Sequence, residues 1–397
     1  MTEAAPPAER LGAPLVLALG LLVSTAPLSV DFYLPSFPAV QTSLHTSATE
    51  VQLTLTGFLV GLGLGQLLWG PISDRFGRRG PLLVGIAVSS VAALGAALAP
   101  SIGVLIAARL VQAVAGSCAV VIGRAIVPDL LRGQDAARAM ALLTTVNYLA
   151  PMIAPVVGGS LAGVLSWRGI LGIVVAVTVA QLVCAALLVP ESLPPARRTA
   201  SVYFGHVGRL LGRPDFRSSA VVAWLVFGMM MSYISSSSFV YQRVLGTPTW
   251  LYGAGFAVNA CGLLAGGVMS ARLHRRGVPP VRILRRSLTL SAVAAVLVLA
   301  VVVSPLPAWL LVVPLWFTIL GAGFSNPNSM SLALESARDV AGSASAVVGA
   351  GMFLLGAAVS PLGGLGGGDS AVPLGVLLTT CAVAALGLFA VARRHHG

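Results

Sequence analysis

The chain of 397 residues contains no lysine, so its 24 basic residues are all arginine. The phosphate-binding loop of ATP-driven enzymes needs a lysine after its glycines, and the sequence therefore excludes a pump powered in that way. Charged residues are also scarce, at 9% of the chain against 57% hydrophobic residues. This composition predicts an all-α protein with many membrane spans and no sizeable soluble domain.

Cysteine and histidine are equally sparse. The four cysteines lie singly in apolar runs, without the spacing of a metal site or a disulfide framework. The five histidines fall outside the predicted spans, and neither a pairing of serine with histidine nor an acid-rich metal motif indicates catalysis within the membrane. We therefore expect no enzyme, no metal and no cofactor.

Apolar runs long enough to cross a bilayer divide the chain into regular segments. They predict twelve helices, at residues 14–36, 50–69, 81–99, 102–125, 137–163, 168–190, 219–243, 249–270, 286–304, 308–330, 341–364 and 371–392. The longest connection, residues 191–218, is rich in proline and arginine and predicts a linker. It separates a first six-helix half, residues 1–190, from a second, residues 219–397.

The net charge of +12 would suit a nucleic-acid-binding protein, but the placement of the arginines argues against one. Nearly all of them fall in the connections on one side of the predicted membrane, which the positive-inside rule assigns to the cytoplasm. We therefore expect a multi-pass protein of the cell inner (plasma) membrane with both termini in the cytoplasm. Its expected partners are lipid and small molecules.

The most distinctive stretch is the charged segment 70–80, which lies between two apolar runs and predicts a tight loop at the membrane surface. An ordinary basic hairpin would explain its arginines but not its glycines or its single acid. The spacing resembles the loop between the second and third helices of the major facilitator superfamily. In that family the loop is a conformational switch, which here would comprise Gly70, Asp74, Arg75, Gly77, Arg78 and Arg79.

An internal repeat supports a duplicated chain. Shifting the sequence by 197 residues aligns six identities of the charged segment with Gly267, Ser270, Arg272, Arg275, Arg276 and Gly277, although Ala271 replaces the acid. Pro155 and Gly158 similarly match Pro361 and Gly364. Two parallel halves with a binding site between them near the bilayer midplane are the layout expected of this superfamily.

Two charged residues stand within the predicted spans. Asp31 follows Val30 toward the outer end of the first span, and Arg109 shares one helix face with Gln112 and Gly116. Ionisable groups at such depth usually face an aqueous cavity or a partner. The alternative is that Asp31 only marks the membrane interface.

The fifth span contains Pro155, Gly158 and Gly159, and this pattern resembles a motif associated with antiporters of the superfamily. Prolines bend a membrane helix, and glycines let it pack closely against a neighbour. The alternative is a kink without any meaning for the direction of transport.

The sequence from Asp31 through Tyr33, Leu34 and Pro35 resembles the Bcr/CflA drug-resistance subfamily, and the likeness continues through most of the chain. It implies a monomeric exporter of chloramphenicol-like or bicyclomycin-like drugs that exchanges them for protons by alternating access. Asp31 and Arg109 would couple the proton, and the switch loop would latch the halves. Proton-coupled uptake or export of a metabolite is the alternative.

Aromatic walls with a few amides suit a drug-sized ligand. On that ground we expect the substrate cavity to include Tyr33, Gln52, Phe58, Gln112, Asn147, Tyr148, Tyr233 and Asn259.

Overall fold

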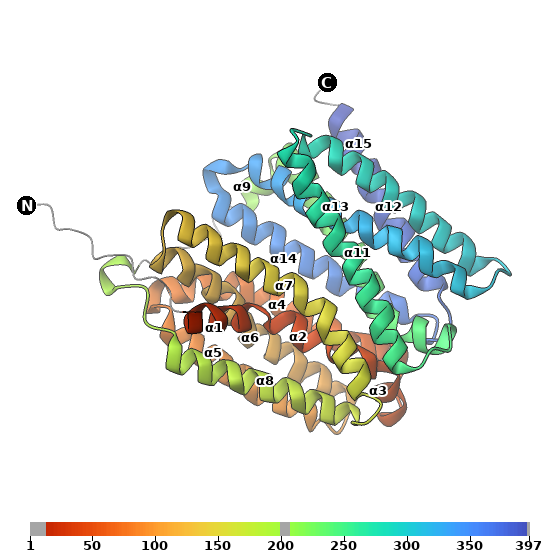
Figure 1. Ribbon diagram of the computed structural model, residues 1–397, viewed down its shortest axis with the longest axis horizontal. Coiled ribbons are helices and arrows are strands. Elements are labelled where there is room, and N and C mark those ends of the chain that lie inside the picture. The colour runs from red at the N-terminus through yellow and green to blue at the C-terminus, as the bar shows by residue number, and fades with distance from the viewer. Residues whose placement is uncertain (1–12, 199–206, 395–397) are drawn as a thin grey trace, which may run out of the picture.

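The protein is described by a computed structural model that covers residues 13–198 and 207–394. Within these ranges it consists of helices and connections, without any strand (Figure 1). Eleven helices in this part of the chain are long and apolar enough to cross a membrane, and a bent helix pair at the start supplies a twelfth span. The predicted twelve-helix fold is confirmed.

The first span is broken into short pieces: α1 (Ala13–Val23), α2 (Thr25–Asp31), the 3₁₀ turn η1 (Leu34–Ser36) and α3 (Phe37–Ser43). The axis bends by 50° where α1 meets α2. Proline explains the break, because Pro27 has no N–H to donate to the carbonyl of Val23 four residues earlier. In the same stretch the hydroxyls of Ser24 and Thr25 donate to the carbonyls of Leu21 and Leu22.

The other long helices are continuous. In the first half they are α4 (Ala48–Phe76), α5 (Arg79–Ala97), α6 (Ile102–Leu130), α7 (Gly133–Leu161) and α8 (Trp167–Leu188). The short α9 (Val207–Leu211) precedes the second half, whose helices are α10 (Pro214–Phe239), α11 (Thr249–Arg275), α12 (Pro280–Val303), α13 (Val312–Glu335), α14 (Ala341–Val359) and α15 (Val372–Arg394). A π-helical turn η4 (Val240–Val244) follows α10. The 3₁₀ turn η5 (Ala308–Leu311) precedes α13, and the 3₁₀ turn η7 (Ser360–Gly364) follows α14.

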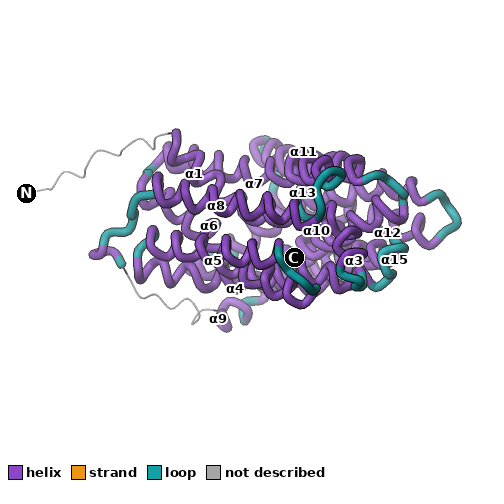
Figure 2. The backbone as a smooth tube through the Cα atoms, turned by 90° about the horizontal axis from the view of Figure 1, so that it is seen from below, coloured by secondary structure: helices purple, strands orange, loops and turns teal. Residues whose placement is uncertain are grey.

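The helices form two groups that meet along a seam. Figure 1 shows α1 to α8 in one group and α10 to α15 in the other, and the view from below in Figure 2 has the labels α1 and α4 to α8 on one side and α10 to α13 and α15 on the other, beside α3. Across the seam α7 packs against α11, and α4 packs against α14. The matched segments of the internal repeat occupy corresponding places in the two groups. The first pair lies at the ends of α4 and α11, and the second pair lies at the end of α7 and in η7, which follows α14.

The helix bundle has two opposite ends. The end that carries residues 74–79 is termed the arginine side, and the opposite end, which carries η1 and η7, is termed the far side. These names describe the molecule alone and do not assign either end to a compartment.

The expected loop at residues 70–80 is shorter than predicted. Helix α4 continues through Pro71 and Asp74 and ends at Phe76, so the turn before α5 consists of Gly77 and Arg78. The charged residues do not end α4, because this part of the helix has left the apolar layer. Gly77 ends it, because its φ of +92° is a backbone conformation that residues other than glycine rarely adopt. Helix α11 likewise continues to Arg275, so His274 is helical and not in a loop.

Candidate functional site

A cavity of about 160 Å³ lies between the two helix groups. Both groups line it, and the lining is almost entirely apolar, with Val30, Leu55, Leu59, Leu62, Phe227, Met230, Met231, Phe256, Leu263, Ile319 and Phe353 among its residues. Pockets that enclose a drug-sized ligand hold roughly 300–1,000 Å³. A ligand of that size would therefore require the groups to separate further at this point.

Asp31 is the one charged side chain among the described residues that line this cavity. It is only 4% exposed and is the last residue of α2. The helix ends there because Pro35, four residues later, has no N–H for the carbonyl of Asp31. The proline pattern thus places a carboxyl group at a break in the first span, beside the cavity.

Arg109 on α6 is completely buried and binds the broken span from the side. Its Nη2 donates to the carbonyl of Ser29 at 2.9 Å, and its Nη1 donates to Oε1 of Gln112 at 2.9 Å. The Ser29 carbonyl can accept because Tyr33 N–H, its α-helical partner, donates to Val30 instead. Arg109 therefore fixes the end of α2, two residues before Asp31.

Three of the predicted cavity residues gather around this guanidinium. The Cζ atom of Arg109 lies 4.2 Å from the ring centroid of Phe58 and 5.2 Å from that of Tyr33, and Gln112 accepts its hydrogen bond. A cation over an aromatic face is attracted by the ring quadrupole, more strongly away from water. Asp31 and Arg109 form no ion pair within the described part of the chain.

The other predicted cavity residues lie in different places. Tyr233 lines the cavity. Gln52 joins the two groups, since its Nε2 donates to the carbonyl of Ser235 at 3.1 Å, and Asn259 donates to Oη of Tyr241 at 3.0 Å. The side chains of Asn147 and Tyr148, in α7, lie outside the described residues.

On the far side the helix groups touch through glycines. A Cβ atom on Gly159 would lie 2.7 Å from the carbonyl oxygen of Thr249 in the other group, whereas one on Gly158 would lie 2.7 Å from that of Phe32, within the first group. A Cβ atom added to Gly253 on α11 would lie 2.5 Å from the carbonyl oxygen of Pro155 on α7. The backbones of α7 and α11 therefore meet where any larger residue would hold them apart.

Gly253→Ala is expected to destabilise this contact by about 1–3 kcal/mol, the usual cost of overpacking a close-packed site. The affected neighbour is backbone and cannot rotate away. The measurement is the thermal unfolding temperature of the purified protein in detergent. Gly267→Ala on the same helix is the control, because the nearest atom to its added Cβ lies 3.9 Å away, and an equal loss in both variants would contradict the prediction.

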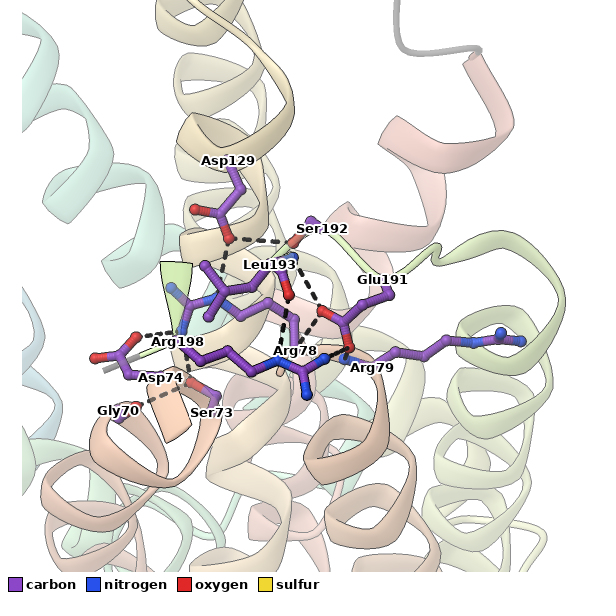
Figure 3. Close-up of polar contacts among 10 residues, drawn as sticks. All are labelled: Gly70, Ser73, Asp74, Arg78, Arg79, Asp129, Glu191, Ser192, Leu193 and Arg198. Atoms are coloured by element: carbon purple, nitrogen blue, oxygen red, sulfur yellow. Dashed lines mark hydrogen bonds and ion pairs between the residues drawn. The ribbon is translucent and has the colours of Figure 1, made fainter. Parts of the chain in front are cut away.

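On the arginine side, Arg78 joins two acids (Figure 3). Its Nη1 lies 2.6 Å from Oδ1 of Asp74, and its Nε lies 2.9 Å from Oδ2 of Asp129 at the end of α6. Nη1 also donates to Oγ of Ser73 at 2.7 Å. The Arg78 side chain is 9% exposed, so its charge is compensated mainly by these partners.

Glu191, just after α8, holds the turn between α4 and α5 (Figure 3). Its carboxylate accepts from the backbone N–H groups of Arg78 at 2.8 Å, Arg79 at 3.3 Å and Leu193 at 3.0 Å, and Arg198 lies 3.9 Å away. Burial raises the pKa of Glu191, but these N–H groups and Arg198 outweigh it and hold the pKa below its usual value. A Cβ on Gly77 would lie 2.5 Å from this carboxylate.

The contacts drawn in Figure 3 all lie within the first helix group and residues 191–198. They tie the end of α4, the start of α5, the end of α6 and the segment after α8 into one unit. A latch between the halves stays a prediction. Sequence reasoning did not assign Asp129 and Glu191 to this site, and the available signal was the presence of acids at the ends of otherwise nearly charge-free spans.

Comparison with known proteins agrees with this architecture. Residues 18–361 match the family model described as Major Facilitator Superfamily. The chain is 33% identical to the "Uncharacterized MFS-type transporter YdgK" of Bacillus subtilis (strain 168), over 98% of this chain and 97% of that protein. It is 28% identical to a "Bicyclomycin resistance protein homolog" of Haemophilus influenzae (strain ATCC 51907 / DSM 11121 / KW20 / Rd), over 93% of each.

The fold also matches solved structures. The human organic anion transporter MFSD10 (TETRAN) superposes with a TM-score of 0.67 at 19% identity, over 98% of this chain and all of that chain. At that identity the match supports the fold alone. The chain is therefore a multi-pass membrane transporter, not an enzyme: it belongs to the major facilitator superfamily, and its resemblance to the Bcr/CflA drug-resistance proteins is confirmed.

Proposed function

We propose that this protein exports small neutral or weakly polar drugs in exchange for protons, by alternating access between residues 1–190 and 219–397, with residues 191–218 as the linker. One observation carries the proposal: a nearly apolar cavity between the helix groups has one described charged residue, Asp31, at a break in a span. Such a cavity suits apolar ligands, and a carboxyl group can take up and release a proton. The name of the bicyclomycin resistance relative supports the substrate class.

The orientation belongs to the same proposal. The arginine side faces the cytoplasm, since cytoplasmic connections are rich in arginine, and both termini lie there. The far-side contacts made by Gly159 and Gly253, together with the bond from Gln242 to the Pro35 carbonyl at 3.0 Å, support a state closed toward the outside. The protein works as a monomer, because each chain has its own cavity.

The test expresses the chain in a host without its own efflux pumps and measures susceptibility to chloramphenicol, bicyclomycin and unrelated antibiotics, with and without an uncoupler. We expect resistance to a subset of compounds that the uncoupler removes. Resistance that survives the uncoupler would contradict proton coupling. Unchanged susceptibility to every compound at verified expression would contradict drug export and favour transport of a metabolite.

A further inference from the structure

The second copy of the charged segment keeps its arginines but has different surroundings. Three arginines end α11 or follow it, and three more occupy the first two turns of α12: Arg272, Arg275, Arg276, Arg282, Arg285 and Arg286. Among the described residues none of the six forms an ion pair, whereas Arg78 in the first copy has two. Ala271 stands where the first copy has Asp74, so this cluster lacks the acid that compensates its counterpart.

Two of these arginines line a pocket of about 240 Å³ on the arginine side, between the end of α11, the start of α12 and α13. Arg282 and Arg286 are one turn apart, so both guanidinium groups stand on the same helix face. The remaining lining is Ser287 and the apolar residues Leu273, Val278, Ile283, Leu290 and Phe324. The pocket therefore combines two positive charges with apolar walls.

The start of α12 adds to the positive potential. The helix dipole places partial positive charge at the N-terminal end of a helix, although the N–H groups of Arg282 and Ile283 themselves donate to the carbonyl of Pro279. Arg282 is the third residue of this 24-residue helix. An anion between Arg282 and Arg286 would meet two guanidinium groups and this helix end together.

An exposed apolar stripe continues from the pocket along α12. Val293, Val296 and Leu297 are 56%, 46% and 52% exposed and follow Arg286 and Thr289 at helical spacing. From Arg286 to Leu297 the helix rises on the order of 16 Å, about half of the ~30 Å hydrocarbon layer. The surface thus presents charge at the membrane boundary and an apolar track about one leaflet deep.

We propose that this surface binds one anionic phospholipid, with its phosphate between Arg282 and Arg286 and an acyl chain along Val293 and Leu297. Basic pockets between membrane helices suit anionic headgroups, and the apolar track favours a lipid over a soluble anion. The inference requires only that the chain lies in a membrane. It does not depend on the transported substrate or on proton coupling.

The experiment measures binding of phosphatidylglycerol to the purified full-length protein in detergent by native mass spectrometry. Each arginine near a charged membrane surface contributes about 1 kcal/mol, so Arg282→Gln with Arg286→Gln is expected to weaken binding about 30-fold. The matched control is Arg276→Gln with Arg285→Gln, which removes the same charge from the same segment outside the pocket lining. Its affinity should stay within about threefold of the unmodified protein.

Two further probes identify the ligand. Phosphatidylcholine, which has no net charge, should bind much more weakly than phosphatidylglycerol, and glycerol 3-phosphate, which has no acyl chains, should not displace the lipid at equal concentration. Equal weakening in both double variants would reduce the site to general charge attraction and overturn the proposal. Equal binding of phosphatidylcholine, or full displacement by glycerol 3-phosphate, would overturn it as well.

Discussion

Asp31→Asn is expected to abolish export against a concentration gradient while leaving substrate binding largely intact. Asparagine has nearly the shape of aspartate but carries no exchangeable charge, so the cavity would keep its apolar walls and lose its proton carrier. Substrate affinity should lose the pH dependence that a titrating carboxyl group beside the cavity gives it. This is the largest functional effect that the structure predicts for a single substitution.

The decisive measurement is substrate-induced proton release from the detergent-solubilised protein in weak buffer. The unmodified protein should release protons when substrate is added, and Asp31→Asn should not. Asp135→Asn is a suitable control, because Asp135 is exposed on the arginine side and its loss removes the same charge without altering the cavity. Undiminished release from Asp31→Asn would assign the coupling proton to another group.

Arg78→Gln is expected to reduce both stability and transport. Asp74 and Asp129 would lose their shared partner, and removing one member of a buried ion pair costs about 3–5 kcal/mol. The two acids are 18% and 19% exposed, so solvent should keep the loss near the lower limit. Because the network is remote from the cavity, transport of every substrate should fall by a similar factor.

Thermal unfolding and transport per folded molecule measure the two effects separately. Arg75→Gln is the matched control: Arg75 follows Asp74 in α4 but is exposed, and the one contact described for its side chain is with the ring of Phe76 at 5.3 Å. It should change the unfolding temperature little. A loss confined to one drug in Arg78→Gln, or equal destabilisation by both substitutions, would contradict a structural role for this network.

Much of the fold followed from composition alone. A chain with 9% charged residues can satisfy its backbone in a bilayer only as helices or closed barrels, and runs of about 20 apolar residues set the spans. The breaks in the first span also have a local cause, because Pro27 and Pro35 each remove the donor for a carbonyl four residues earlier. Asp31 and Arg109 were recognisable as membrane-depth charges because each stands within such an apolar run.

The tertiary structure decided which partners these groups have. Arg109 binds the Ser29 carbonyl and not Asp31, because helix packing brings the freed end of α2 to it. Arg78 meets Asp129, 51 residues later, and its backbone meets Glu191, 113 residues later. No local pattern encodes such pairings: they depend on how α4, α6 and α8 end beside one another, whereas helical spans and proline breaks depend only on residues within a few positions.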